Sequence, residues 1–256
     1  MSLATIQFRC NICGHRTAAL ASLLREREMP SCEFCGSTTR LRSTVRALSL
    51  GLFGESFPLT DFPARRDLRG IGLSEWPGYL PLLEDRFDFL NTFYHQEPFL
   101  DITAPPQDMF GTADFIISSE VFEHTPPPAQ QAFDGAFALL KPGGLLVLTT
   151  PFRTDAEETE EHFPCLHEWS ITEGDDGLYV LCNRTEDGRD EVFTNLCFHG
   201  GPGSTLEMRV FSRSAIERHL AEAGFVDVRF RDEDETTYGV MWQGSWSVPI
   251  SARKRI

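Results

Sequence analysis

The sequence lacks several features that would place the protein in a membrane or outside the cell. No apolar run approaches the roughly 20 residues that a helix needs to cross a bilayer, and the N-terminus lacks the basic-then-apolar pattern of a signal peptide. Seven cysteines in 256 residues are too few for a disulfide scaffold. These absences predict a soluble, cytoplasmic protein.

Basic residues are also scarce. The chain has 23 Lys and Arg against 38 Asp and Glu, a net charge of -15. Affinity for nucleic acids comes largely from basic side chains that neutralise phosphates, so this balance disfavours a nucleic-acid partner. The first 50 residues differ, with seven Arg and three Glu. Local contact with an anion there remains an alternative to a plain solvated helix face.

Four of the cysteines stand in two copies of the motif Cys-x-x-Cys-Gly near the N-terminus. In each copy a tight turn can present two thiolates to one ion, and the glycine tolerates the left-handed backbone of the turn. With all four ligands from protein sulfur, no position stays open for a reactant, so the motif predicts a structural zinc ribbon over residues 1–38. A redox dithiol and unmetallated cysteines are the alternatives. The predicted ligands are Cys10, Cys13, Cys32 and Cys35.

The rest of the chain alternates predicted strands and helices. Residues 39–64 read as a connecting helix and a turn-rich linker. Beyond them, continuous apolar strands separated by amphipathic helices predict a mainly parallel, twisted sheet with helices on both faces. In such sheets ligands bind at the carboxyl ends of the strands. The expected strands are residues 67–73, 87–93, 99–103, 114–122 and 145–152, and the expected helices are 78–87 and 130–140.

Two segments of this α/β region resemble class I S-adenosylmethionine-dependent methyltransferases. Residues 114–152 carry a strand, the pair Glu123-His124, a helix, the phrase Leu-Lys-Pro-Gly-Gly and a further strand. Residues 208–231 resemble the closing helix and strand of that family. The resemblance implies a Rossmann-like fold over residues 65–256, with S-adenosylmethionine as cofactor and an insertion at about residues 153–208.

The cofactor loop departs from the family pattern. Gly70-Ile-Gly72-Leu-Ser74 stands where the family has three glycines, and the usual preceding acid is absent. An ordinary strand-to-helix turn is the alternative explanation of these glycines. The family's ribose-binding acid is replaced by asparagine, while an aspartate stands where a side chain often contacts the adenine. The predicted cofactor-binding residues are Gly70, Gly72, Ser74, Asn91, Phe93, Asp101, Ile102 and Glu120.

Methyl transfer to a hydroxyl or an ammonium requires a base, and histidines are the candidates. His124 follows the fourth strand, whereas His162 and His199 belong to the insertion, which we expect to shape the acceptor pocket. Each of them has a plain packing role as its alternative. A metal site drawn from His162, His167 and His199 is disfavoured, because Pro164 removes any compact helical spacing.

The sequence therefore predicts methyl transfer to a small-molecule, sugar or other non-nucleic acceptor. Two alternatives stay open. The first is an RNA methyltransferase that uses the ribbon for capture, and the second is a degenerate, non-catalytic binding module, suggested by the altered glycine loop. The acceptor atom and the oligomeric state are not predicted.

Overall fold

A computed structural model describes residues 4–256 except 175, 202 and 245. Its centre is a six-stranded sheet of order β15-β16-β6-β5-β3-β4, in which β16 runs antiparallel to both of its neighbours and the other strands are parallel. This mostly parallel arrangement confirms the predicted α/β class. The strands are β3 (Arg65–Leu73), β4 (Phe87–Thr92), β5 (Ala113–Ser119), β6 (Leu140–Thr149), β15 (Phe225–Phe230) and β16 (Ile250–Lys254).

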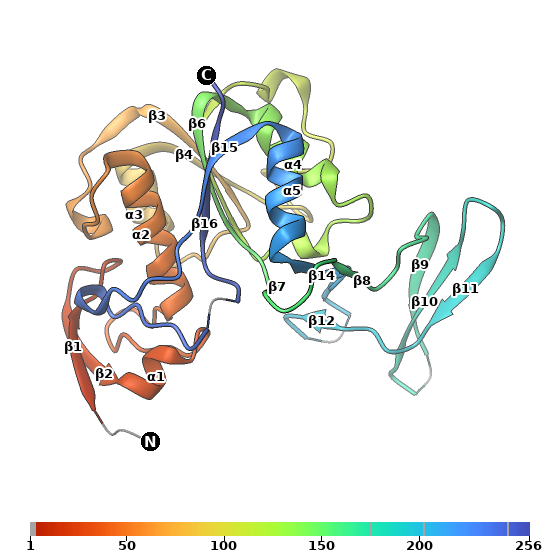
Figure 1. The fold of residues 1–256 in the computed structure, drawn as a ribbon, viewed down its shortest axis with the longest axis horizontal. Helices are drawn as coiled ribbons and strands as arrows, with labels where there is room; N and C mark the ends of the chain where they lie inside the picture. Colours follow the sequence, from red (N-terminus) through yellow and green to blue (C-terminus); the bar gives the residue numbers. More distant parts are fainter. Residues whose placement is uncertain (1–3, 175, 202, 245) are drawn as a thin grey trace.

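Helices cover both faces of the sheet (Figure 1), because each central strand is apolar on both sides. In β5, Ile116 faces the core under α4 and α5, while its neighbour Ile117 faces the core under α2 and α3. Adjacent residues of a strand point to opposite faces, so a continuous apolar run is buried twice. The helices are α2 (Thr39–Phe53), α3 (Leu80–Arg86), α4 (Gln130–Leu139) and α5 (Arg213–Ala223), and the 3-10 turns are η1 (Leu59–Asp61), η2 (Gln107–Met109), η3 (Phe122–His124) and η4 (Thr236–Tyr238).

The N-terminal unit is a hairpin of β1 (Thr5–Arg9) and β2 (Arg16–Leu20), followed by the short helix α1 (Ala21–Arg25). Its apolar side chains share one core with α2 and the sheet. The segment expected as a connecting helix is therefore a layer of the main fold: α2 packs against β6 and β16, and a Cβ added at Gly51 would lie 2.4 Å from Leu145. The ribbon thus rests on the α/β domain through a shared helix.

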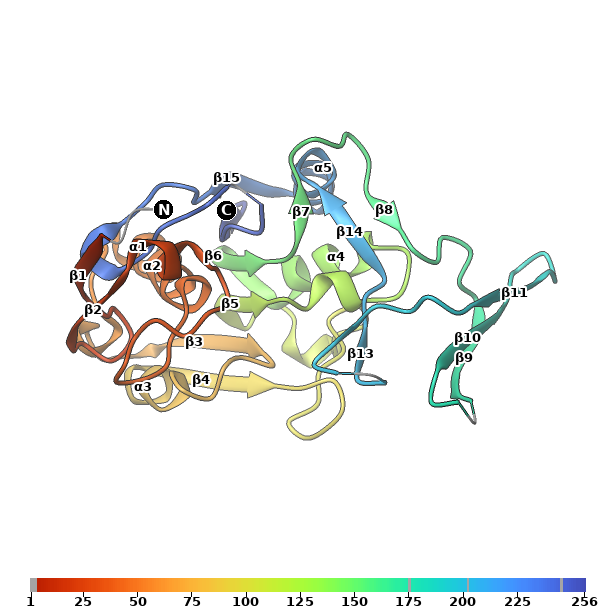
Figure 2. The same ribbon diagram turned by 90° about the horizontal axis from the view of Figure 1, so that it is seen from below.

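The insertion forms three small β units. In the first, β14 (Arg209–Ser212) pairs with β7 (Phe152–Arg153) and β8 (Glu160–Glu161). The second is an antiparallel arm that projects away from the sheet (Figure 2). The third is a two-stranded hairpin next to the domain. The arm consists of β9 (Glu168–Glu173), β10 (Tyr179–Arg184) and β11 (Asp190–Phe193), and the hairpin of β12 (Phe198–His199) and β13 (Thr205–Leu206).

One expected strand is wrong. Residues 99–103 form no strand, and their only pairing is a single bridge between Phe93 and Phe99. Pro98, Pro105 and Pro106 bracket the segment, and proline offers no N–H to a ladder. The chain therefore crosses the end of β4 as a loop.

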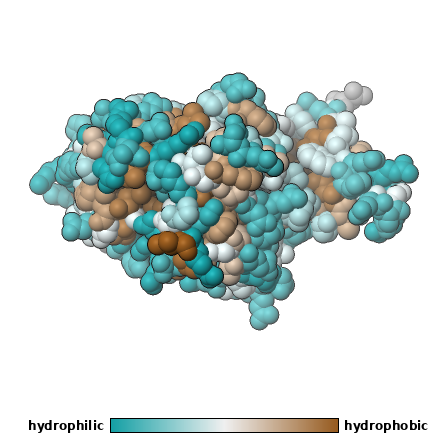
Figure 3. All heavy atoms as spheres, turned by 90° about the horizontal axis from the view of Figure 1, so that it is seen from above, coloured by the Kyte–Doolittle hydropathy of each residue, from teal (hydrophilic) through white to brown (hydrophobic). Residues whose placement is uncertain are grey.

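One face of the molecule shows how polar and apolar residues are distributed on its surface. Seen from above, it is mainly hydrophilic, with apolar residues in small separate areas (Figure 3). Among the residues that the structure describes, no helix is long and apolar enough to cross a bilayer.

Candidate functional site

A pocket of about 420 Å³ lies at the carboxyl ends of the parallel strands. Ser74 follows β3, Phe93 follows β4 and Glu120 follows β5, and all three line it. Ser74 and Glu120 both have a φ of 56°, which is uncommon for residues other than glycine. Their backbones are held in place, since Ser74 N donates to the Thr92 carbonyl at 2.8 Å and Glu120 N donates to the Thr149 carbonyl at 2.9 Å. Strained backbone of this kind often marks a functional site.

Five of the eight predicted cofactor residues line this pocket: Ser74, Phe93, Asp101, Ile102 and Glu120. Asp101 uses its Oδ1 to accept hydrogen bonds from the backbone N (2.8 Å) and hydroxyl (2.7 Å) of Thr103. Its Oδ2 has no hydrogen-bond partner within the described residues. The local turn therefore fixes the carboxylate and leaves one oxygen available to a ligand.

The other three, Gly70, Gly72 and Asn91, do not line the pocket. A Cβ at Gly70 would lie 2.2 Å from Phe115, and one at Gly72 would lie 2.7 Å from Asn91 Oδ1. The space beside both glycines is thus filled by neighbouring side chains that pack directly against the backbone of β3, so it is not available to a ligand. Asn91 Oδ1 accepts from the backbone N of Glu75 at 3.0 Å, so it organises the loop after β3.

Glu75 itself was missed by the sequence reasoning. It is buried, and it accepts hydrogen bonds from the backbone N and the hydroxyl of Ser119, both at 3.0 Å, and from Tyr79. Burial raises the pKa of this carboxyl group. The residue ties the loop after β3 to the end of β5 and so shapes the pocket rim. Its only signal in the sequence is an acid within an otherwise apolar turn.

Glu123 and His124 lie in the 3-10 turn η3, just past the end of β5, and His124 lines the pocket. The Nδ1 of His124 lies 2.8 Å from the Leu206 carbonyl, which can only accept, so Nδ1 carries the proton and Nε2 is the acceptor nitrogen. Burial lowers the pKa of His124. Glu123 is fully buried, accepts from Thr150 at 2.9 Å, and has its pKa raised well above the usual range by burial and by the nearby Glu120.

Two of the three histidines of the insertion, His162 and His199, meet on one carboxylate. His199 lines the pocket, and its Nε2 lies 3.0 Å from Glu207 Oε2. His162 Nε2 lies 2.9 Å from Glu207 Oε1, but His162 lines a neighbouring cavity instead of the pocket. The rings of His124 and His199 are perpendicular, with centroids 4.8 Å apart. The structure therefore brings His124 and His199 together and leaves His162 behind Glu207.

An ion pair connects the pocket to the N-terminal unit. Arg27 Nη2 donates to Glu120 Oε1 at 2.6 Å, and the exposed fraction of the two side chains is 8% and 20%. Arg27 Nε also donates to the Ser247 carbonyl at 3.2 Å, and its guanidinium lies 5.5 Å from the Trp246 ring centre. Residues 27 and 120 are far apart in the sequence, and no local pattern predicts their contact.

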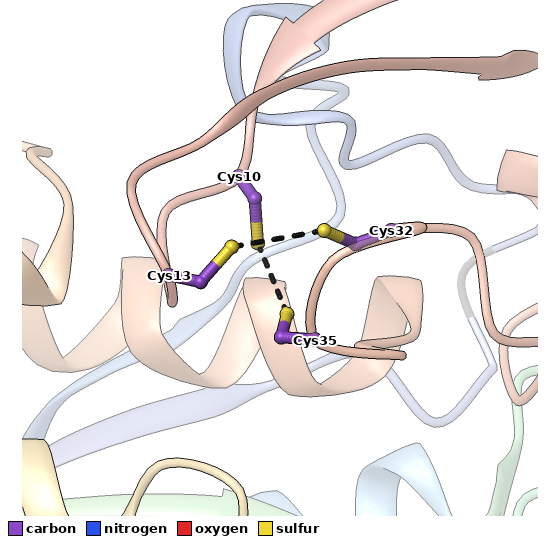
Figure 4. Close-up of side chains that lie close together, drawn as sticks. All are labelled: Cys10, Cys13, Cys32 and Cys35. Carbon is purple, nitrogen blue, oxygen red and sulfur yellow. Dashed lines mark hydrogen bonds between the residues drawn. The ribbon is translucent and has the colours of Figure 1, made fainter.

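The four predicted cysteines gather in two facing turns (Figure 4). The Sγ atoms of Cys10 and Cys35 are 3.7 Å apart, as are those of Cys13 and Cys32. Gly14 and Gly36 have φ angles of 77° and 71°, and their backbone N–H groups close the turns at 2.9 and 2.8 Å. The glycines thus have the left-handed conformation that the motif predicts.

The sheet order, with one antiparallel strand beside its edge and a pocket at the strand ends, defines a Rossmann-like fold of the class I methyltransferase type. A family model described as a methyltransferase domain matches residues 67–229. The chain belongs to this methyltransferase-domain family. A comparison with curated proteins finds no match.

Solved structures of similar fold include several methyltransferases. The CurJ carbon methyltransferase is 16% identical, with a TM-score of 0.45, and the match covers 77% of this chain but only 50% of that one. The 1,6-didemethyltoxoflavin-N1-methyltransferase of Burkholderia thailandensis is 13% identical (TM-score 0.44; 85% and 78% covered). CalS10, an amino pentose methyltransferase from Micromonospora echinaspora, is 14% identical (TM-score 0.46; 86% and 92% covered). Likeness at this level does not identify a substrate.

Proposed function

We propose that this chain transfers a methyl group from S-adenosylmethionine to a small-molecule or sugar acceptor. The observation that carries the proposal is the pocket at the strand ends, in which a carboxylate with an open oxygen and three histidines, His95, His124 and His199, line one cavity. Its volume of about 420 Å³ lies within the usual range of ligand pockets, about 300–1,000 Å³. When bound, the cofactor supplies an electrophilic methyl carbon on a sulfonium.

The donor half of the pocket comprises Ser74, Phe93, Asp101 and Ile102. Asp101 Oδ2 is placed to accept from an amino or hydroxyl group of the cofactor, because the turn at Thr103 holds the carboxylate still. Phe93 and Ile102 offer apolar surface to a flat ring. Ser74 stands in place of the family's third glycine, and its left-handed backbone, with a φ of 56°, supports its assignment to the cofactor loop.

The acceptor half contains His124, His199 and Trp169. We infer that His124 is the general base: its Nε2 is the acceptor nitrogen, and its lowered pKa keeps the ring neutral near pH 7. His199 is held by Glu207 and flanks the same position. His162 does not line the pocket, so its proposed role is to support Glu207. An in-line reaction needs the acceptor about 3 Å from the methyl carbon, so the most important task of these side chains is to position the acceptor.

We also propose that the four cysteines bind one structural zinc ion. Zinc–sulfur bonds of about 2.3 Å in a tetrahedron separate the sulfurs by about 3.8 Å, close to the 3.7 Å of the two pairs. Arg42 supports the assignment: it is fully buried, and no carboxylate pairs with it among the described residues. A zinc ion with four thiolates has a net charge of -2, and Arg42 reaches Cys10 through the Ser37 hydroxyl (3.2 and 3.3 Å).

Calorimetric titration with S-adenosylmethionine and S-adenosylhomocysteine tests the donor. Micromolar binding is expected, and Asp101→Ala should weaken it by about tenfold, the loss of roughly 1.4 kcal/mol for a hydrogen bond to a charged group. Asp108→Ala is the matched control, because Asp108 is exposed and does not line the pocket. Absence of binding to either compound would favour the degenerate binding module.

Transfer of a labelled methyl group to pools of small molecules and sugars tests the reaction. His124→Gln should lower kcat by about 100-fold or more while the cofactor Kd stays unchanged. His167→Gln, an exposed histidine outside the pocket, should retain full activity. Labelling of RNA instead of small molecules, with a steep dependence on salt, would replace the proposed acceptor class.

A further inference from the structure

The hairpin of β12 and β13 places a thiol, an imidazole and a carboxylate on one side. His199 pairs with Thr205 in the hairpin, and Glu207 N donates to the Cys197 carbonyl at 2.8 Å, which extends the pairing by one step. Side chains alternate along a strand, and directly paired residues point to the same side. Cys197, His199 and Glu207 therefore share one side of the hairpin.

The ligand atoms of these three residues all lie within 4.8 Å of one another. His199 Nε2 and Glu207 Oε2 are 3.0 Å apart. Zinc bonds of about 2.0–2.1 Å to nitrogen and oxygen separate tetrahedral ligand atoms by about 3.3–3.4 Å. Widening this contact by about 0.3 Å would thus admit an ion, a shift that two side chains of a surface hairpin can make.

We propose that Cys197, His199 and Glu207 bind a second zinc ion, distinct from the ion of the four-cysteine ribbon. One thiolate, one imidazole and one carboxylate form a ligand set typical of zinc. With three protein ligands, the fourth position is open to water or to another oxygen donor. The proposal depends only on the hairpin and not on methyl transfer.

His162 has a defined place in this arrangement. Its Nε2 donates to Glu207 Oε1 at 2.9 Å, the oxygen that His199 does not touch. Hydrogen bonds to a ligating carboxylate orient it, and their loss typically weakens metal binding by about 10–100-fold. His162 is therefore a positioning residue, while His167, which belonged to the set drawn from sequence, lines a different cavity.

The site lies between two cavities. His199 lines the pocket at the strand ends, whereas Cys197 and Glu207 line the neighbouring cavity of about 420 Å³. Glu123, His124 and His199 form another close group, but Glu123 Oε1 and His124 Nε2 are 3.8 Å apart and this group lacks a thiol. Cys197 is exposed, so an ion can reach its ligands from solvent.

Zinc content per chain tests the proposal on the full-length protein. After loading with zinc and removal of loosely bound ions, wild-type protein should hold two ions. The double variant Cys197→Ser/His199→Gln should hold one. Cys182→Ser, which removes an exposed thiol of the arm, is the matched control and should hold two. Retention of one ion and a cooperative thermal unfolding transition would show that the double variant is folded.

Titration with zinc against a competing chelator refines the test. His162→Gln should keep the second ion but weaken its affinity by about 10–100-fold, whereas Glu207→Gln should abolish it. With cobalt in place of zinc, Cys197→Ser should remove part of the thiolate-to-metal absorption. A single ion in the wild-type protein would overturn the proposal in favour of a His-Glu-His hydrogen-bond network. A second ion that survives in the double variant would overturn it as well.

Discussion

Replacing Arg27 by alanine should destabilise the protein through the carboxylate that it leaves behind. Arg27 is nearly buried and pairs with Glu28 and with Glu120, whose side chain is 20% exposed. Removing one partner of a fully buried ion pair costs about 3–5 kcal/mol. Because water can reach a fifth of Glu120, we expect a smaller loss of about 2 kcal/mol, roughly a 30-fold change in the folding equilibrium.

Urea denaturation of a double-mutant cycle measures this loss and assigns it to the pair. Arg27→Ala, Glu120→Gln and the double variant should give an interaction energy of about 1–2 kcal/mol, since the double variant leaves no uncompensated charge. Arg65→Ala provides the control, because Arg65 and its partner Asp67 are both exposed, and it should change the free energy of unfolding by less than about 0.5 kcal/mol. If the effects of the two single substitutions add to that of the double variant within about 0.3 kcal/mol, the expected coupling between Arg27 and Glu120 is refuted.

Three further perturbations test separate parts of the structure. The stability of Glu123→Gln relative to wild type should increase as pH rises from 5 to 7. In the wild type the Glu123 carboxyl ionises in the unfolded chain above its ordinary pKa, whereas burial keeps it protonated in the folded protein, so the wild type loses stability over this range. A difference in urea midpoints that does not change with pH would contradict this. Gly70→Ala should lose about 1–3 kcal/mol, since its Cβ meets Phe115, yet keep the cofactor Kd of the folded protein. Cys13→Ser should lower the thermal unfolding midpoint and release one zinc, whereas Cys165→Ser, an exposed thiol, should do neither.

The elements that the sequence predicts are those set by local pattern. The apolar run around Ile116 and Ile117 requires a strand buried on both faces, and the structure confirms it. The two Cys-x-x-Cys-Gly turns form as predicted, because the spacing and the glycine conformation are local properties. Glu120 lines the pocket as its place after a strand predicts, because side chains converge at the carboxyl ends of parallel strands, whereas Asp101 is predicted from the family resemblance and lies in a loop.

Other features depend on contacts that no local pattern specifies. The pattern of a strand does not reveal what a glycine in it packs against. Gly70 is therefore predicted to belong to a ligand loop, although it packs against Phe115. The meeting of His162 and His199 on Glu207 requires the path of the whole insertion. The expected strand at residues 99–103 does not form, because the prolines around it cannot donate the backbone hydrogen bonds that a sheet requires.

The position of Glu120 links the three parts of the chain. It follows β5 in a left-handed conformation, lines the pocket and pairs with Arg27 of the N-terminal unit. If the affinity of a ligand depends on this pair, binding of that ligand must strengthen the packing of the N-terminal unit against the α/β domain by the same factor. The reason is that the coupling free energy between two binding events is reciprocal. The N-terminal unit would then contribute to the pocket without touching the ligand, through the contact of Arg27 with Glu120.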